Sequence, residues 1–132
     1  MSIPLLIANV LTLLAFLAHA IQGDKEIRTI SPDPKLDTEF KKQEKWSQAR
    51  AGWHMVSFDL LFASVGLAVI NFTEHLPNEK ILLQIFAVYF LGYAIFWLFS
   101  ILISKKFPGN FLKLGQWILL LVISSLIFWA SC

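Results

Sequence analysis

The chain contains four long apolar runs. The segments between these runs hold nearly all the charged residues. The runs cover Ile3–Gln22, Ala51–Phe72, Ile81–Ile103 and Phe111–Ala130. A helix needs about 20 residues to cross the hydrocarbon core of a bilayer, so each run is long enough to do so. Only one carboxylate, Asp59, lies inside any of them. The pattern predicts an all-α protein, an integral membrane four-helix bundle that forms a single transmembrane domain over residues 1–132.

The helix boundaries follow from the prolines and the charged segments. Pro32 and Pro34 interrupt the segment between the first two runs, because proline lacks an N–H donor and disfavours helix in the residue before it. A new helix then begins near Asp37 or Thr38, either of which can cap its first turn. We predict helices at about 3–22, 38–72 (membrane part 51–72), 81–103 and 111–130, a basic loop over 23–50, and turns at Leu76–Asn78 and Phe107–Asn110.

The distribution of the basic residues predicts the orientation of the chain. Ten of the eleven lysines and arginines fall on one side of the predicted membrane: nine lie in the segments that join the first two runs or the last two, and Lys113 lies at the start of the fourth run. Cytoplasmic loops of membrane proteins are enriched in these residues, so both segments are predicted to be cytoplasmic. Both termini then lie on the non-cytoplasmic side of a membrane that the chain crosses several times. The first run lacks the positively charged start of a signal peptide, so we expect it to remain as an uncleaved transmembrane helix.

The composition agrees with a membrane protein and narrows the possible functions. Hydrophobic residues make up 57% of the chain and charged residues 15%, whereas about 25% charged residues is usual in a soluble domain. A net charge of +2 is too small to favour nucleic acid as a partner. Cys132 is the only cysteine, which excludes disulfide frameworks and cysteine-based metal sites.

Polar residues inside the runs recur at helical spacing, and many of them are predicted to lie at the same depth in the membrane. Such residues usually face the interior of a bundle, where Ser, Thr, Asn and His bond across helices and hold them together. Because the first and third helices end at the cytoplasm and the second and fourth begin there, many polar and tryptophan side chains are predicted to converge near the cytoplasmic face. The candidates for a ligand pocket at this depth are His19, Glu26, Arg50, Trp53, His54, Ser57, Tyr93, Trp97, Ser100, Gln116 and Trp117.

Two histidines at matched depth leave several roles open. His19 and His54 could ligate a haem or a metal between adjacent antiparallel helices. They could instead take part in proton or quinone chemistry, because imidazole titrates near neutral pH. A purely structural role is the third alternative, with hydrogen bonds to Glu26, to Gln116 or to backbone. The sequence therefore does not identify a cofactor, and haem is kept as one possibility.

Asp59 lies on a different face of the second helix. Its neighbours on that face include the small residues Gly52, Ala63 and Gly66, which would let another helix approach closely. A carboxylate in hydrocarbon is expected to be protonated or paired. This face is therefore predicted to meet another helix, from the same chain, from a homo-oligomer or from a larger membrane complex.

Short motifs in three places give a family resemblance. His19 with Gly23 and Glu26, the pair Trp53-His54, and the pair Gln116-Trp117 resemble a group of small four-helix bacterial inner-membrane proteins of unassigned function. The last motif in that group reads Pro-Gln-Trp, where this chain has Gly115. The resemblance implies a four-helix fold and a bacterial inner (plasma) membrane, but no activity.

Our leading hypothesis is a non-enzymatic small membrane protein. It would act as an accessory subunit, or as a binder of a lipid-like ligand in the polar pocket near the cytoplasmic face. One alternative is a haem- or quinone-linked redox protein that uses His19 and His54. The other is an oligomeric channel or transporter that uses Asp59.

Overall fold

The computed structural model describes residues 1–132 apart from 34, 36–38, 74–75 and 105–110, and over the described residues it is all-helical, without strands. The elements are α1 (Ile3–Leu17), the π-helix η1 (Ala18–Gly23), α2 (Asp24–Thr29), α3 (Phe40–Phe72), α4 (Glu79–Ile103) and α5 (Gln116–Ala130). Because α1, η1 and α2 follow one another without a break, the described chain has four helical segments. Three of them, Ile3–Thr29, Phe40–Phe72 and Glu79–Ile103, are long and apolar enough to cross a membrane, and α5 is a shorter apolar helix. The predicted all-α class is confirmed.

The first helical segment continues beyond its predicted end at Gln22 and reaches Thr29. Gly23 does not interrupt it, because its backbone keeps helical angles, with φ −66° and ψ −37°. The segment ends just before Pro32, which agrees with the bias of proline against helix in the residue that precedes it. Residues 24–29, predicted as loop, are therefore helical, and Glu26 lies within the helix rather than beyond it.

The π-helix η1 is a short interruption of the α-helical hydrogen-bond pattern within this segment. It covers Ala18–Gly23, and its hydrogen bonds run from i to i+5. Gly23 at its end and Ile27 in α2 are both buried. Short π-helical turns of this kind occur within α-helices and are frequent at functional sites.

Helix α3 is continuous over 33 residues, which corresponds to about 50 Å at 1.5 Å per residue. This length exceeds the roughly 30 Å of a bilayer's hydrocarbon core, so part of α3 would project beyond it. The apolar run begins at Ala51, and the residues before it are mostly charged or polar. The predicted caps Asp37 and Thr38 lie outside the described residues.

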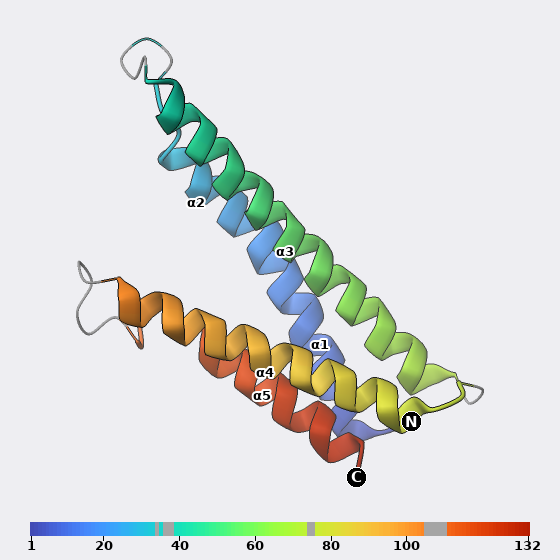
Figure 1. Ribbon diagram of the computed structural model, residues 1–132. Helices are drawn as coiled ribbons and strands as arrows, with labels where there is room; N and C mark the ends of the chain where they lie inside the picture. Colours follow the sequence, from blue (N-terminus) through green and yellow to red (C-terminus); the bar gives the residue numbers. More distant parts are fainter. Residues whose placement is uncertain (34, 36–38, 74–75, 105–110) are drawn as a thin grey trace. The chain divides into compact units, whose positions relative to one another are not determined.

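The chain divides into two compact units, which we describe separately. One comprises residues 12–64 and is called the hairpin unit; the other comprises residues 1–11 and 65–132 and is called the α4–α5 unit. In the hairpin unit the chain runs through η1 and α2 and returns along the first half of α3 (Figure 1). The single domain expected over residues 1–132 stays a prediction.

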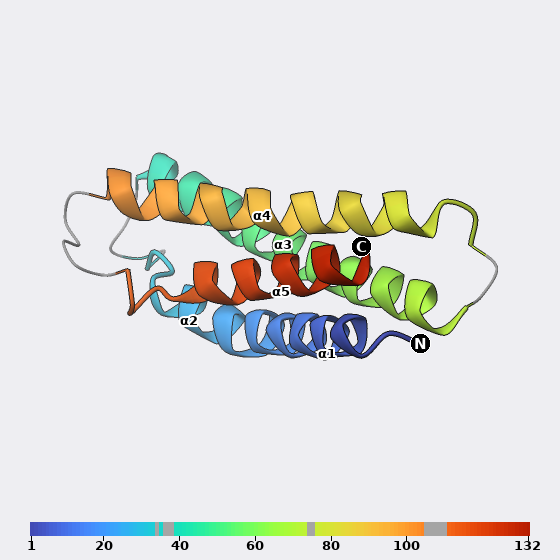
Figure 2. The same ribbon diagram turned by 90° about the horizontal axis from the view of Figure 1, so that it is seen from below.

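In the α4–α5 unit, α4 and α5 lie side by side in both ribbon views (Figures 1 and 2). Small side chains let them approach closely: Ala87 is buried, and the buried Ser124 hydroxyl donates to the Ala87 carbonyl oxygen over 2.7 Å. Phe90, Ile123 and Ile127 are almost completely buried in the same unit.

The ends of these helices follow local chemistry. The predicted turn before α4 is present, and its Asn78 adopts the left-handed conformation with φ 62°. Helix α5 begins at Gln116 rather than at Phe111, because residues 111–115 form turns. Two indole N–H groups hold these turns: Trp117 donates to the Phe111 carbonyl oxygen, and Trp97 donates to that of Leu114. The turn predicted at Phe107–Asn110 lies outside the described residues.

Candidate polar site in the hairpin unit

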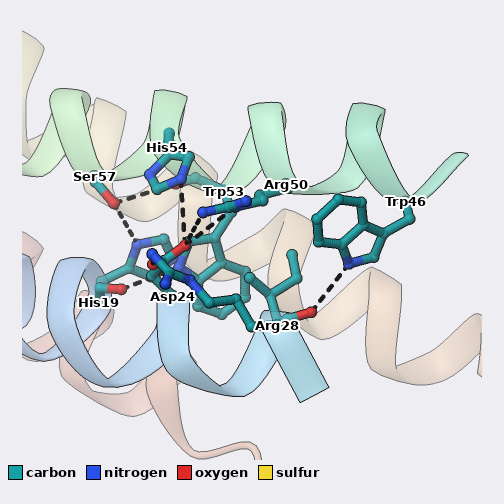
Figure 3. A network of polar contacts seen from close by, with 9 residues as sticks. His19, Asp24, Arg28, Trp46, Arg50, Trp53, His54 and Ser57 are labelled. Atoms are coloured by element: carbon teal, nitrogen blue, oxygen red, sulfur yellow. Dashed lines mark hydrogen bonds and ion pairs between the residues drawn. The ribbon is translucent and has the colours of Figure 1, made fainter. Parts of the chain in front are cut away.

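A cluster of polar and aromatic side chains joins η1 and α2 to α3 in the hairpin unit (Figure 3). We call it the polar cluster. Its members are His19, Asp24, Arg28, Trp46, Arg50, Trp53, His54 and Ser57. Asp24 follows the first apolar run and Arg50 precedes the second. The cluster therefore lies where both apolar runs end.

Trp53 packs flat against the first helical segment. Its ring stacks on that of His19, with centroids 4.1 Å apart and planes 8° from parallel. Its Nε1–H donates to the His19 carbonyl oxygen over 3.0 Å. A Cβ at Gly23 would overlap the indole and lie 2.7 Å from its Nε1. Glycine is thus the residue that allows this close approach.

Ser57 and His19 are joined by a hydrogen bond between η1 and α3. The Ser57 Oγ lies 3.0 Å from Nδ1 of His19 and 3.3 Å from the Trp53 carbonyl oxygen. The hydroxyl can donate to either atom, and the tautomer of His19 decides which of the two receives its proton. Ser57 is 6% exposed, so the hydroxyl is buried.

Asp24 is the centre of the charged part of the cluster (Figure 3). Its Oδ2 pairs with Arg28 one turn later, and its Oδ1 accepts from Nε of Arg50 over 3.2 Å. The same oxygen lies 3.4 Å from Nε2 of His54. The carboxylate is only 13% exposed, whereas the side chain of Arg28 is 62% exposed. Two guanidinium groups therefore share one carboxylate.

The electrostatic balance at Asp24 favours its ionised form. Its carboxylate accepts hydrogen bonds from the guanidinium groups of Arg28 and Arg50, and both of these charges attract it. The group lies in the polar continuation of the first helical segment, past the apolar run that ends at Gln22.

Trp46 adds a second tie between α2 and α3. Its Nε1–H donates to the Ile27 carbonyl oxygen over 3.0 Å. The guanidinium carbon of Arg50 lies 5.4 Å from the centre of its ring, within the range of a cation–π interaction. This contact holds Arg50 from one side while Asp24 holds it from the other.

The structure brings together some of the predicted pocket residues and places the others elsewhere. His19, Arg50, Trp53, His54 and Ser57 meet in the polar cluster. The side chain of Glu26 is exposed and accepts a hydrogen bond from Gln22, so it is not a partner of either histidine. The remaining predicted residues belong to the α4–α5 unit, and their convergence on the same pocket stays a prediction; they are Tyr93, Trp97, Ser100, Gln116 and Trp117.

Asp24, Arg28 and Trp46 were missed as site residues by sequence reasoning. Asp24 and Arg28 follow the apolar run in a segment that was predicted as loop, where no helical face could be assigned. The spacing of four residues between them is a helical ion-pair signal that would have identified them.

The positions on the predicted interface face of α3 differ in how closely other side chains approach them. Gly52 has open space around it, whereas a Cβ at Gly66 would lie 2.7 Å from Cζ of Phe86 on α4. Ala63 is buried. Asp59 lines an open hollow on α3 together with Ala51, His54, Met55 and Phe58. A role of this face in assembly stays a prediction.

Both histidines are engaged by other parts of the chain. One ring face of His19 lies against Trp53, its Nδ1 bonds Ser57, and Nε2 of His54 faces Asp24. A bis-histidine haem would have to displace several of these contacts. No group of three His, Cys, Asp or Glu side chains that could hold a metal is found among the described residues.

The fold and the cluster define a helical protein with three apolar helices of membrane-spanning length and a charged cluster that joins two of them. Comparison of the chain with protein-family models, with curated proteins and with solved structures gave no match. The resemblance to small four-helix inner-membrane proteins therefore depends on its short motifs alone.

Proposed function

We propose that this chain is a small integral membrane protein that binds a lipid-like ligand, or a partner subunit, at the polar cluster and catalyses no reaction. The observation that carries the proposal is the position of the Asp24-centred ion network at the junction of two apolar runs and their polar continuations. A charged network at that point suits the boundary between headgroups and hydrocarbon.

The membrane part of the proposal is supported by the composition of the long helices. The most apolar windows of the three candidate spans have mean hydropathies of 2.1, 1.9 and 2.2. Charged residues gather in the segments that join the runs. We propose that the basic segment after α2 faces the cytoplasm of a bacterial cell and that both termini face the opposite side.

A ligand-binding role is supported by the surface next to the cluster. The open hollow on α3 begins at Ala51 and His54, beside the charged groups, and continues along Met55 and Phe58. Polar groups at one end and apolar groups along the rest match an amphiphile, whose head and tail need these two environments.

A catalytic role for the Ser57–His19 pair is disfavoured by its surroundings. A nucleophilic serine must reach its substrate and must have its proton taken by a base. Ser57 is 6% exposed, and its hydroxyl lies within hydrogen-bond distance of both Nδ1 of His19 and the Trp53 carbonyl oxygen. This pair joins two helices and leaves no accessible nucleophile.

The proposal is tested on the purified full chain. Membranes from expressing cells are washed with alkaline carbonate, and the retained protein is extracted in mild detergent and analysed by native mass spectrometry. We expect the chain to stay in the washed membrane and to carry bound lipid that is reduced by Arg50→Gln but not by the charge-matched control Lys45→Gln. Release by carbonate, or equal lipid retention in both variants, would contradict the proposal.

A further inference from the structure

We propose that the ligand of the polar cluster is a phospholipid with an anionic headgroup, whose phosphate is bound by Arg28, Arg50 and His54. This inference rests on the proposed membrane function, because it places the cluster at headgroup depth. It goes further by naming the chemistry of the ligand and the groups that recognise it.

The charge of the cluster is the first argument. Among the described residues, Asp24 is the one carboxylate that forms ion pairs with Arg28 and Arg50. Two permanent positive charges thus face one negative charge, and His54 adds another when it is protonated. A bound phosphate would balance this surplus, whereas a neutral headgroup would leave it in place.

The hydrogen-bonding capacity of the two arginines is the second argument. A guanidinium has five N–H donors in a planar fork that matches the oxygens of a phosphate. Arg50 directs Nε and one Nη toward a single oxygen of Asp24, and Arg28 directs one Nη toward the other oxygen. Each of the two guanidinium groups therefore keeps N–H donors that are not directed at Asp24. The side chains of Arg28 and His54, 62% and 51% exposed, can be reached from outside.

Pre-organisation is the third argument. Arg50 is 32% exposed and is held between Asp24 and the face of Trp46. Trp46 is itself fixed by its hydrogen bond to the Ile27 carbonyl oxygen. A guanidinium that is already positioned loses less conformational freedom when it binds, and binding is stronger for that reason.

The apolar hollow on α3 provides room for the rest of the lipid. From Arg50 to Phe58 the helix rises about 12 Å, which covers the upper part of an acyl chain. Ala51, Met55 and Phe58 supply apolar surface along this distance. Asp59 also lines the hollow, about 13.5 Å from Arg50 along the axis and away from the phosphate. A soluble phosphate compound would make no use of this surface.

The test compares phosphatidylglycerol with phosphatidylcholine. The full chain in neutral detergent is titrated with each lipid, and the bound fraction is followed by native mass spectrometry. We expect the natural sequence to prefer phosphatidylglycerol. Removing one cation near the membrane surface should weaken that preference about fivefold, and removing two should weaken it about thirtyfold.

Three variants make the test specific. Arg28→Gln/Arg50→Gln removes both guanidinium groups, and Lys41→Gln/Lys45→Gln removes the same charge from two lysines of the same basic region that are not members of the cluster. Arg28→Gln alone keeps the fold, because Asp24 retains Arg50 and His54; it should show the fivefold loss even if the double variant is unstable. Equal losses in the arginine and lysine double variants would overturn the proposal, since they would show attraction to surface charge alone.

Two further outcomes separate the sources of failure. If excess glycerol 3-phosphate displaces phosphatidylglycerol, the site recognises a soluble phosphate and the lipid assignment is wrong. If the chain stays in carbonate-washed membranes but binds both lipids equally, the headgroup assignment fails and the membrane proposal stands. If carbonate releases the chain, the membrane proposal itself fails.

Discussion

At the scale of single residues, the hairpin unit depends on a glycine beneath a tryptophan. The Trp53 ring is fixed by its stacking on His19 and by its hydrogen bond to the His19 carbonyl oxygen. It lies directly over Gly23, where any larger side chain would overlap it. The backbone angles of Gly23 are helical, so this position does not need the conformational freedom of glycine. Glycine is needed here because it has no Cβ.

We therefore expect Gly23→Ala to destabilise the protein by about 1–3 kcal/mol, the usual range for overpacking. The measurement is unfolding in mixed micelles, followed by circular dichroism. Gly52→Ala is the matched control, because nothing lies within 4 Å of the position of its Cβ. Alanine has the higher helix propensity, so this control should lose no stability. Equal effects of the two substitutions would contradict the packing explanation.

Ser57 gives a second test at this scale. Ser57→Ala removes the hydroxyl that bonds Nδ1 of His19 and leaves that ring nitrogen without this partner, which should destabilise the protein by about 1 kcal/mol. The exposed Ser125 bonds only the carbonyl oxygen of Leu121 on its own helix, so Ser125→Ala should change stability by less than about 0.5 kcal/mol. The same unfolding experiment compares them, and a larger effect at Ser125 would argue against the assigned role of Ser57.

Part of the cluster was predictable from helical spacing and depth alone. Arg50, His54 and Ser57 fall on one stripe of α3, and His19 lies at the matching depth of the first run. Asp24 was not predictable in the same way, because a residue assigned to a loop has no helical face. Glu26 was selected for its charge, but the winding of the helix turns its side chain outward, toward Gln22.

At the scale of elements, the long apolar runs predicted the helices, and local hydrogen bonds decided where the helices begin and end. Helix α5 begins late because two indole N–H groups bind the carbonyl oxygens of the preceding turns. The π-helix had no recognisable signal, since a widened turn changes the hydrogen-bond ladder without requiring a special residue.

The pairing of α4 with α5 provides the prediction at this scale. Ala87 is buried, and its carbonyl oxygen accepts the Ser124 hydroxyl, so Ala87→Leu should force the helices apart and lower stability by about 1–3 kcal/mol. Val88 is 67% exposed, and Val88→Leu adds a methylene on the next residue without meeting that interface. Thermal unfolding of both variants in detergent is the measurement. If Val88→Leu destabilised the protein as much as Ala87→Leu, small-residue packing between α4 and α5 would not be the cause.

At the scale of the whole molecule, orientation decides what the polar cluster can meet. The cations that border the cluster are the same residues that, by the positive-inside rule, predict a cytoplasmic location for the segment between α2 and α3. If this orientation is right, the Asp24 network faces the inner leaflet, and lipids of that leaflet are the ones it can bind. The lipid proposal and the topology proposal are therefore linked, although they are tested by different measurements.

Cysteine labelling can test the topology, because the chain has one exposed cysteine at its C-terminal end. We expect a small membrane-impermeant maleimide to label Cys132 in intact bacterial cells, since both termini are proposed to be non-cytoplasmic. In a Cys132→Ser background, a cysteine introduced at the exposed Ser31 should react only after the inner membrane is permeabilised. Because each protein is labelled before and after permeabilisation, differences in expression do not imitate the pattern. Labelling of the Ser31→Cys variant in intact cells, together with labelling of Cys132 in the natural sequence only after permeabilisation, would reverse the orientation and place the polar cluster at the outer leaflet.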